Sequence, residues 1–118
     1  MVIDSTNVIA YVEREAVVVE FKGEHDLTTR NEVASLLRLL LEEHDLVVVD
    51  ISEARFIDSS FIHNLFTADA RARETCRRFR VQYATASIMQ ACLEISGGLD
   101  DLDCVRTREE AIEQEMIA

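Results

Sequence analysis

The clearest candidates for chemistry are Asp58, Ser59 and Ser60, a carboxylate and two hydroxyls that stand where a helical pattern begins. Small polar side chains at such a position accept hydrogen bonds from the unpaired N–H groups of the first helical turn, so helix capping is one interpretation. The other interpretation is that one serine accepts a phosphoryl group. A phosphate there would add roughly −1.5 to −2 charge and meet the positive end of the helix dipole, so the modified protein could stay folded.

Motifs for enzymatic chemistry do not accompany these residues. The sequence has no GxxxxGK[ST] and no GxGxxG, and hence no glycine loop that cradles a phosphate. Its three histidines lack HxxxH or HExxH spacing and its three cysteines lack CxxC spacing, which argues against a metal site. The only lysine, Lys22, lies in the second predicted strand, whereas a phosphoaspartate receiver domain needs a lysine after a late strand. We therefore expect a protein that is not an enzyme and that holds no cofactor or metal.

Length and charge limit the partners that the chain can have. Its 118 residues predict a single domain over 1–118. Lys and Arg number 12 against 23 Asp and Glu, a net charge of −11, which disfavours binding to nucleic acid or to an anionic membrane surface. No apolar run nears the ~20 residues of a membrane-spanning helix, the N-terminus lacks a signal-peptide pattern, and the odd cysteine number indicates reduced thiols. These features predict a cytoplasmic protein without membrane insertion.

The candidate serines follow a buried strand in a regular alternation of strands and helices. Residues 8–12 and 16–22 predict a hairpin, and residues 46–51 are almost unbroken apolar sequence, typical of a strand covered on both faces. Further strands are predicted at 78–83 and 102–105, and helices at 29–43, 58–76, from Ser87 to Gly97 and from Thr107 onward. This order predicts an α/β fold with a mostly parallel sheet under helical cover. Residues 23–27 are expected to form a loop, and no element is assigned to 52–57.

Helical periodicity also predicts which side chains are buried. In the helix at 58–76 they are Ile62, Leu65, Phe66, Ala68, Ala72 and Cys76. In the helix after Ser87 they are Ile88, Ala91, Cys92 and Ile95, and in the last helix Ala111, Ile112 and Met116. A basic run indicates either a solvated helix end or a surface that steers an acidic partner; its members are Arg71, Arg73, Arg77, Arg78 and Arg80.

Two neighbouring segments carry a family resemblance. Residues 47–52 (VVVDIS) followed by 54–60 (ARFIDSS) resemble the signature of STAS domains, the fold of bacterial anti-sigma factor antagonists. Residues 21–28 (FKGEHDLT) resemble the family's G-E-L-D-like loop, and residues 87–102 its later region, where a short helix ends at a G-L pair. The resemblance spans almost the whole chain and implies an α/β fold, a STAS-like mixed β-sheet of about five strands packed against about four α-helices.

The resemblance also implies a function. In the family the first serine of the D-S-S motif, here Ser59, is phosphorylated by a partner that is both anti-sigma factor and serine kinase. The unmodified protein binds that partner and so frees a sigma factor, and a metal-dependent phosphatase of the PP2C type reverses the modification. Catalysis then belongs to the partners, and the sequence leaves open whether the chain also forms a homodimer. The implied partner-binding residues are Asp26, Asp58, Ser60, Phe61, Ile62 and His63.

The sequence departs from the family pattern directly after the serines. The motif usually continues D-S-S-G-[LIV]-G, but Phe61 and His63 stand here at the two glycine positions. Phe61 either packs on the core, or it and His63 form a partner-specific contact or block the kinase. The departure favours an alternative function, a non-phosphorylated STAS module docked on a transporter ATPase or in a signalling scaffold. A nucleotide-binding domain is a third hypothesis, which the missing phosphate loop disfavours.

Overall fold

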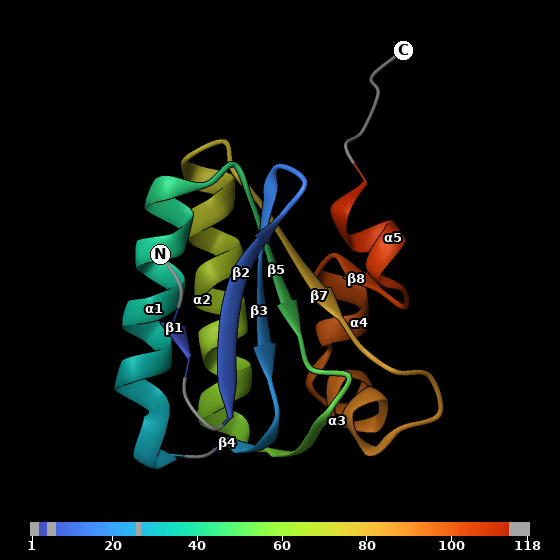
Figure 1. Ribbon diagram of the computed structural model, residues 1–118. Helices are drawn as coiled ribbons and strands as arrows, with labels where there is room; N and C mark the ends of the chain where they lie inside the picture. The colour runs from blue at the N-terminus through green and yellow to red at the C-terminus, as the bar shows by residue number, and fades with distance from the viewer. Residues whose placement is uncertain (1–2, 5–6, 26, 114–118) are drawn as a thin grey trace.

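The computed structural model describes residues 3–4, 7–25 and 27–113 (Figure 1). Its main sheet has six strands in the order β1-β2-β3-β5-β7-β8. The pairs β1–β2 and β2–β3 are antiparallel, and the pairs β3–β5, β5–β7 and β7–β8 are parallel. The strands are β1 (Ile3–Asp4), β2 (Val8–Glu13), β3 (Ala16–Phe21), β5 (Leu46–Asp50), β7 (Arg78–Gln82) and β8 (Cys104–Val105). The predicted α/β class with a mixed sheet is confirmed; in this main sheet, the two-residue β1 was not expected.

The four predicted helices follow the strands in the predicted order, and the structure adds a 3-10 turn before the first of them and a short helix after the third. They are the 3-10 turn η1 (Leu27–Thr29), α1 (Arg30–Glu43), α2 (Ser59–Glu74), α3 (Ile88–Ser96), α4 (Gly98–Asp101) and α5 (Arg108–Ile112). Ser87 and Thr107 stand three residues before Gln90 and Glu110, a spacing that predicts capping boxes, and they accept hydrogen bonds from the N–H groups of those residues, so these two caps are confirmed. The same spacing of Thr29 and Glu32 predicts a cap of α1, but Thr29 makes no side-chain capping hydrogen bond there, so that prediction was wrong. No helix of the described residues is long and apolar enough to cross a bilayer.

The central strands are buried on both faces, as their unbroken apolar sequence predicts. Val47 and Val49 join the larger core cluster, which includes side chains of α1 and α2. Val48 faces the opposite side and packs with Ala111 and Ile112 of α5. The sheet therefore has long helices on one face and a single short helix on the other.

A small second sheet replaces the predicted loop at 23–27 and the unassigned segment at 52–57. Strand β4 (Gly23–His25) pairs in parallel with β6 (Ala54–Ile57), and the register shifts between Gly23 and Glu24. Gly23 has a φ of 73°, a conformation that favours glycine. Because β6 leads directly into α2, this pairing places the start of that helix.

The predicted buried faces are confirmed in part. Leu65, Ala68 and Ala72 of α2 are buried, as are Ala111 and Ile112 of α5, whereas Met116 lies outside the described residues. Cys76 was wrongly expected in the core: it is exposed and follows the end of α2 with a φ of 58°.

The face predicted for α3 was wrong except at Cys92, which is half-buried against the core. Ile88, Ala91 and Ile95 are exposed, and Met89 and Leu93 are the side chains that enter the core. Because apolar residues occur on most sides of this helix, periodicity alone does not select the face that packs.

The run of arginines does not form one surface. Arg71 and Arg73 lie in the last turn of α2, which matches the helix-end interpretation. Arg80 is only 6% exposed and donates to the backbone carbonyls of Glu110, Ala111 and Glu113 at 3.2, 3.1 and 2.9 Å. It therefore caps the end of α5, and a steering surface that includes it is excluded.

Candidate functional site

Asp58 is the N-cap of α2, as the capping interpretation of residues 58–60 predicts. Its backbone is extended, and its carboxylate accepts the N–H of Phe61 at 3.1 Å and the hydroxyl of Ser60 at 2.6 Å. Its own N–H donates to the carbonyl of His25 at 3.3 Å, which ties the cap to β4. The capping role therefore falls on the carboxylate and its neighbour Ser60, and not on Ser59.

Hydrogen bonds favour the ionised form of this cap. Partial burial opposes ionisation of Asp58, but donation from the Ser60 hydroxyl and from the backbone N–H groups of Phe61, Ser60 and Leu27 outweighs it. The pKa of Asp58 consequently lies below its ordinary value. A full negative charge thus lies next to Ser59 at neutral pH.

Replacing Asp58 by alanine should lower the free energy of unfolding by about 1 kcal/mol at neutral pH, the usual contribution of an N-cap. Because the pKa of Asp58 is lowered by folding, its stabilisation is present above the unfolded-state pKa and is lost as the pH falls through the folded one. The difference between wild type and variant should therefore shrink below about pH 4. Urea unfolding across pH measures this, with Asp58→Ser as the control that keeps a cap. Equal midpoints for wild type and Asp58→Ala would contradict the assignment.

Ser59 presents its side chain to solvent. It is the first residue of α2 and is exposed, whereas Ser60 is half-buried and donates to Asp58. Among the described residues, the carboxylate of Asp58 accepts from Ser60, Phe61 and Leu27, and the hydroxyl of Ser59 takes part in none of these hydrogen bonds. The hydroxyl of Ser59 is therefore free to meet another protein.

Phe61 belongs to the core. It is 2% exposed and lies edge-on to Phe21, with ring centroids 5.1 Å apart and an interplanar angle of 80°. Its centroid is 5.6 Å from that of His25, a buried residue of β4. The core-packing interpretation thus matches the structure, and Phe61 was wrongly expected among the partner-contacting side chains. Its ring does not cover Ser59.

The other predicted contact residues differ in exposure. His63 is exposed, and Ile62 is half-buried with its side chain packed partly against the core. Asp26 lies outside the described residues. The structure thus brings Asp58, Ser59 and Ser60 together at the helix start, with His63 exposed in the same helix.

Comparison with known families decides the classification. A family model described as "Mlab, STAS domain" matches residues 11–105, most of the chain. The chain belongs to this STAS-domain family. No curated protein sequence matches it.

Solved structures show the same fold as this STAS domain. The Bacillus cell fate determinant SpoIIAA in its phosphorylated form is 20% identical with a TM-score of 0.68, over 89% of this chain and 96% of that one. The anti-sigma factor antagonist SpoIIAA in its unphosphorylated form is 19% identical with a TM-score of 0.72, over 89% and 92%. An anti-sigma factor antagonist from Mycobacterium paratuberculosis is 17% identical with a TM-score of 0.74, over 90% of each chain.

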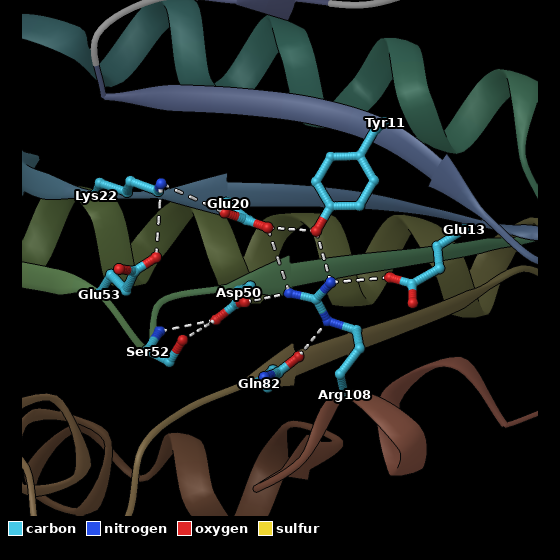
Figure 2. A network of polar contacts seen from close by, with 9 residues as sticks. All are labelled: Tyr11, Glu13, Glu20, Lys22, Asp50, Ser52, Glu53, Gln82 and Arg108. Carbon is cyan, nitrogen blue, oxygen red and sulfur yellow. Dashed lines mark hydrogen bonds and ion pairs between the residues drawn. The ribbon is translucent and has the colours of Figure 1, made fainter.

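A second polar cluster of the STAS domain lies on the sheet face that α5 covers, and the sequence did not indicate it (Figure 2). Arg108, the first residue of α5, donates to Gln82 at 2.7 Å, to Tyr11 at 2.6 Å and to Glu13 at 2.9 Å, and also to the carboxylate of Asp50. These partners come from three strands, so the guanidinium holds α5 against the sheet.

Charge and burial set the protonation of this Arg108 cluster. Partial burial opposes the charge of Arg108, but hydrogen bonds to Tyr11, Glu13 and Asp50 outweigh it and raise the pKa of Arg108. Burial, and then the hydrogen bond to Glu20, raises the pKa of Tyr11. Every polar group of the cluster that Figure 2 draws contacts another, so we assign it a structural role.

Metal binding finds no support in the described part of the chain. No group of three or more histidine, cysteine, aspartate or glutamate side chains there could hold a metal ion.

Proposed function

We propose that this STAS domain is a cytoplasmic anti-sigma factor antagonist. Unmodified, it would bind an anti-sigma factor that is also a serine kinase, and a sigma factor would be released. Phosphorylation of Ser59 by that kinase would end the binding, and a PP2C-type phosphatase would restore it. The observation that carries the proposal is the exposed hydroxyl of Ser59 at the start of α2, left out of a cap that Asp58 and Ser60 complete.

The local electrostatics suit such a modification. The first turn of α2 directs N–H groups toward the modified residue, so a phosphate on Ser59 would not unfold the helix. The ionised Asp58 beside it would add like charge in any interface that excludes water. A dianion in that place must be desolvated without a paired cation, which is unfavourable. A loss of ~3 kcal/mol of association would weaken binding about a hundredfold. The chain itself would be substrate and regulator, and catalysis would belong to its partners.

Incubation of the wild-type chain with the host's anti-sigma factor kinase and ATP should add one phosphate, detected by intact mass measurement. Ser59→Ala should abolish the addition because it removes the acceptor oxygen. Ser60→Ala is the matched control, since its hydroxyl already donates to Asp58, and it should still be labelled. Labelling of Ser59→Ala equal to that of the wild type would refute the proposal.

One observation favours a second candidate, a STAS module that is not phosphorylated and docks on a transporter ATPase or a signalling scaffold. His63 occupies a position where the antagonists' motif has glycine, and its side chain is exposed. Pull-down from the native host separates the two functions: recovery of a transport ATPase without a kinase-like partner would favour this candidate.

A further inference from the structure

Helix α3 exposes large apolar side chains although it packs on the core. Ile88 is 73% exposed and Ile95 is 88% exposed, and Ala91 between them is exposed too. Spacings of three and four residues place these positions on one face of the helix. Met89 and Leu93, which enter the core, lie on another face. The helix is thus apolar on two faces, of which the fold uses one.

Two more exposed apolar side chains lie at the same end of the molecule. Phe56 in β6 is 48% exposed, and Leu27 in η1 is 62% exposed. Strand β6 packs against α3 and leads into Asp58, whose carboxylate also accepts the N–H of Leu27. In Figure 1, α3 and the first turn of α2 lie at the same lower end. Strand β6 thus joins the two regions: it contacts α3, and it precedes the helix that begins at Ser59.

The fold of the isolated chain leaves much of these four side chains unburied. Isoleucine is a weaker helix former than alanine or glutamine, and an exposed isoleucine gains no burial. Large apolar side chains exposed along one face of a helix, as Ile88 and Ile95 are, are typical of surfaces that another molecule covers. We name Leu27, Phe56, Ile88 and Ile95 the apolar patch.

We propose that the apolar patch is a contact surface for the anti-sigma factor, which covers it together with Ser59. This inference rests on the proposed function and adds to it a surface on α3 that the D-S-S motif does not include. A phosphate on Ser59 would then have to be desolvated at the edge of an apolar contact, which explains how one modification could weaken a larger interface.

The acidic residues near the apolar patch indicate what kind of molecule would cover it. Residues 81–105 contain four acidic side chains and no lysine or arginine, and three of the acids, Glu94, Asp100 and Asp101, are exposed in α3 and α4. A second copy of the chain would bring the same acidic rim to a symmetric contact, and an anionic membrane would be repelled as well. The partner surface that fits is an apolar centre with lysine or arginine beside it, which pairs with the α3–α4 carboxylates.

The test uses the full chain and the host's anti-sigma factor kinase, without ATP for binding and with ATP for labelling. Ile88→Gln and Ile95→Gln should each raise the dissociation constant about tenfold, and the double variant about a hundredfold. Losses of this size are typical when a buried anchor residue of an interface is replaced. Glutamine suits an exposed helix position, so the thermal unfolding midpoint of the variants should stay at the wild-type value. Leu39→Gln is the matched control, an exposed leucine on α1, and it should bind like the wild type.

The outcomes separate this inference from the proposed function. If the kinase labels Ser59 of the wild type but the double variant binds unchanged, the apolar patch is refuted and the proposed function stands. If the variants lose binding while Ser59 is never labelled, the patch is supported and the phosphorylation proposal fails. If the kinase does not bind the wild type, both fail. A wild-type dimer in sedimentation that the double variant dissociates would overturn the inference in favour of a second copy.

Discussion

Replacement of Phe61 by alanine should lower the free energy of unfolding by about 3–5 kcal/mol, the range for removing a buried phenylalanine. The ring is 2% exposed and packs edge-on against Phe21. Its removal would leave a cavity between the first turn of α2 and the end of β3, lined also by His25 of β4. Urea unfolding followed by circular dichroism measures the loss, which is a large part of the stability of a domain of this size.

His63→Ala is the control for this prediction, since the side chain is exposed two positions later in the same helix. It should change the free energy of unfolding by less than about 0.5 kcal/mol. Phe61→Leu keeps most of the apolar volume and should fall between the two variants. A stable Phe61→Ala protein would show that the ring does not support the fold, and would reopen a partner contact at this position.

The burial of Phe61 could not be predicted from the sequence. An aromatic residue directly after two serines is compatible with a core contact or a partner contact, because other segments of the chain build the pocket that decides between them. Here Phe21 and His25 supply that pocket, more than thirty residues earlier in the chain. By contrast, the carboxylate of Asp58 caps α2 by accepting from Ser60 and Phe61, which lie within three residues, and local spacing predicted this place.

The difference between local patterns and contacts with remote segments also explains the other wrong or missing predictions. Helix α1 was predicted from its helical period and β5 from its unbroken apolar run, because each of these signals lies within one segment. The pairing of β4 with β6 was missed because three or four residues carry no period and the partner strand is remote in sequence. The packed face of α3 was misassigned because apolar residues occur on more than one face, and the sequence does not show which face a partner protein would need.

The polar cluster around Arg108 joins residues that are far apart in the sequence, and for this reason it was not predicted. The hydrogen bond between Arg108 and Tyr11 joins residues 97 positions apart, and Asp50 was visible in the sequence only as an interruption of an apolar strand. In the structure the carboxylate of Asp50 accepts from Arg108 and from the backbone N–H and hydroxyl of Ser52. A single charged residue within a strand is thus a signal for a partner elsewhere, but it does not identify that partner.

Arg108→Met should lower the free energy of unfolding by about 3 kcal/mol, because it leaves a buried carboxylate without its cation. The side chain of Asp50 is 7% exposed, and that of Glu20, which also faces the guanidinium, is 20% exposed. Methionine keeps the apolar stem, so the expected loss reports on charge and hydrogen bonds more than on packing. Detachment of α5 would in addition expose the apolar residues that it covers, Val18 among them.

Two comparisons make the Arg108 prediction decisive. Arg106→Met removes an exposed arginine two residues earlier and should change the free energy of unfolding by less than about 0.5 kcal/mol. Adding Asp50→Asn to Arg108→Met replaces the uncompensated carboxylate by a neutral group of the same shape, so the double variant should regain part of the loss. If Arg108→Met were as stable as Arg106→Met, or if Asp50→Asn deepened the loss additively, the guanidinium would not be what secures α5 to the sheet.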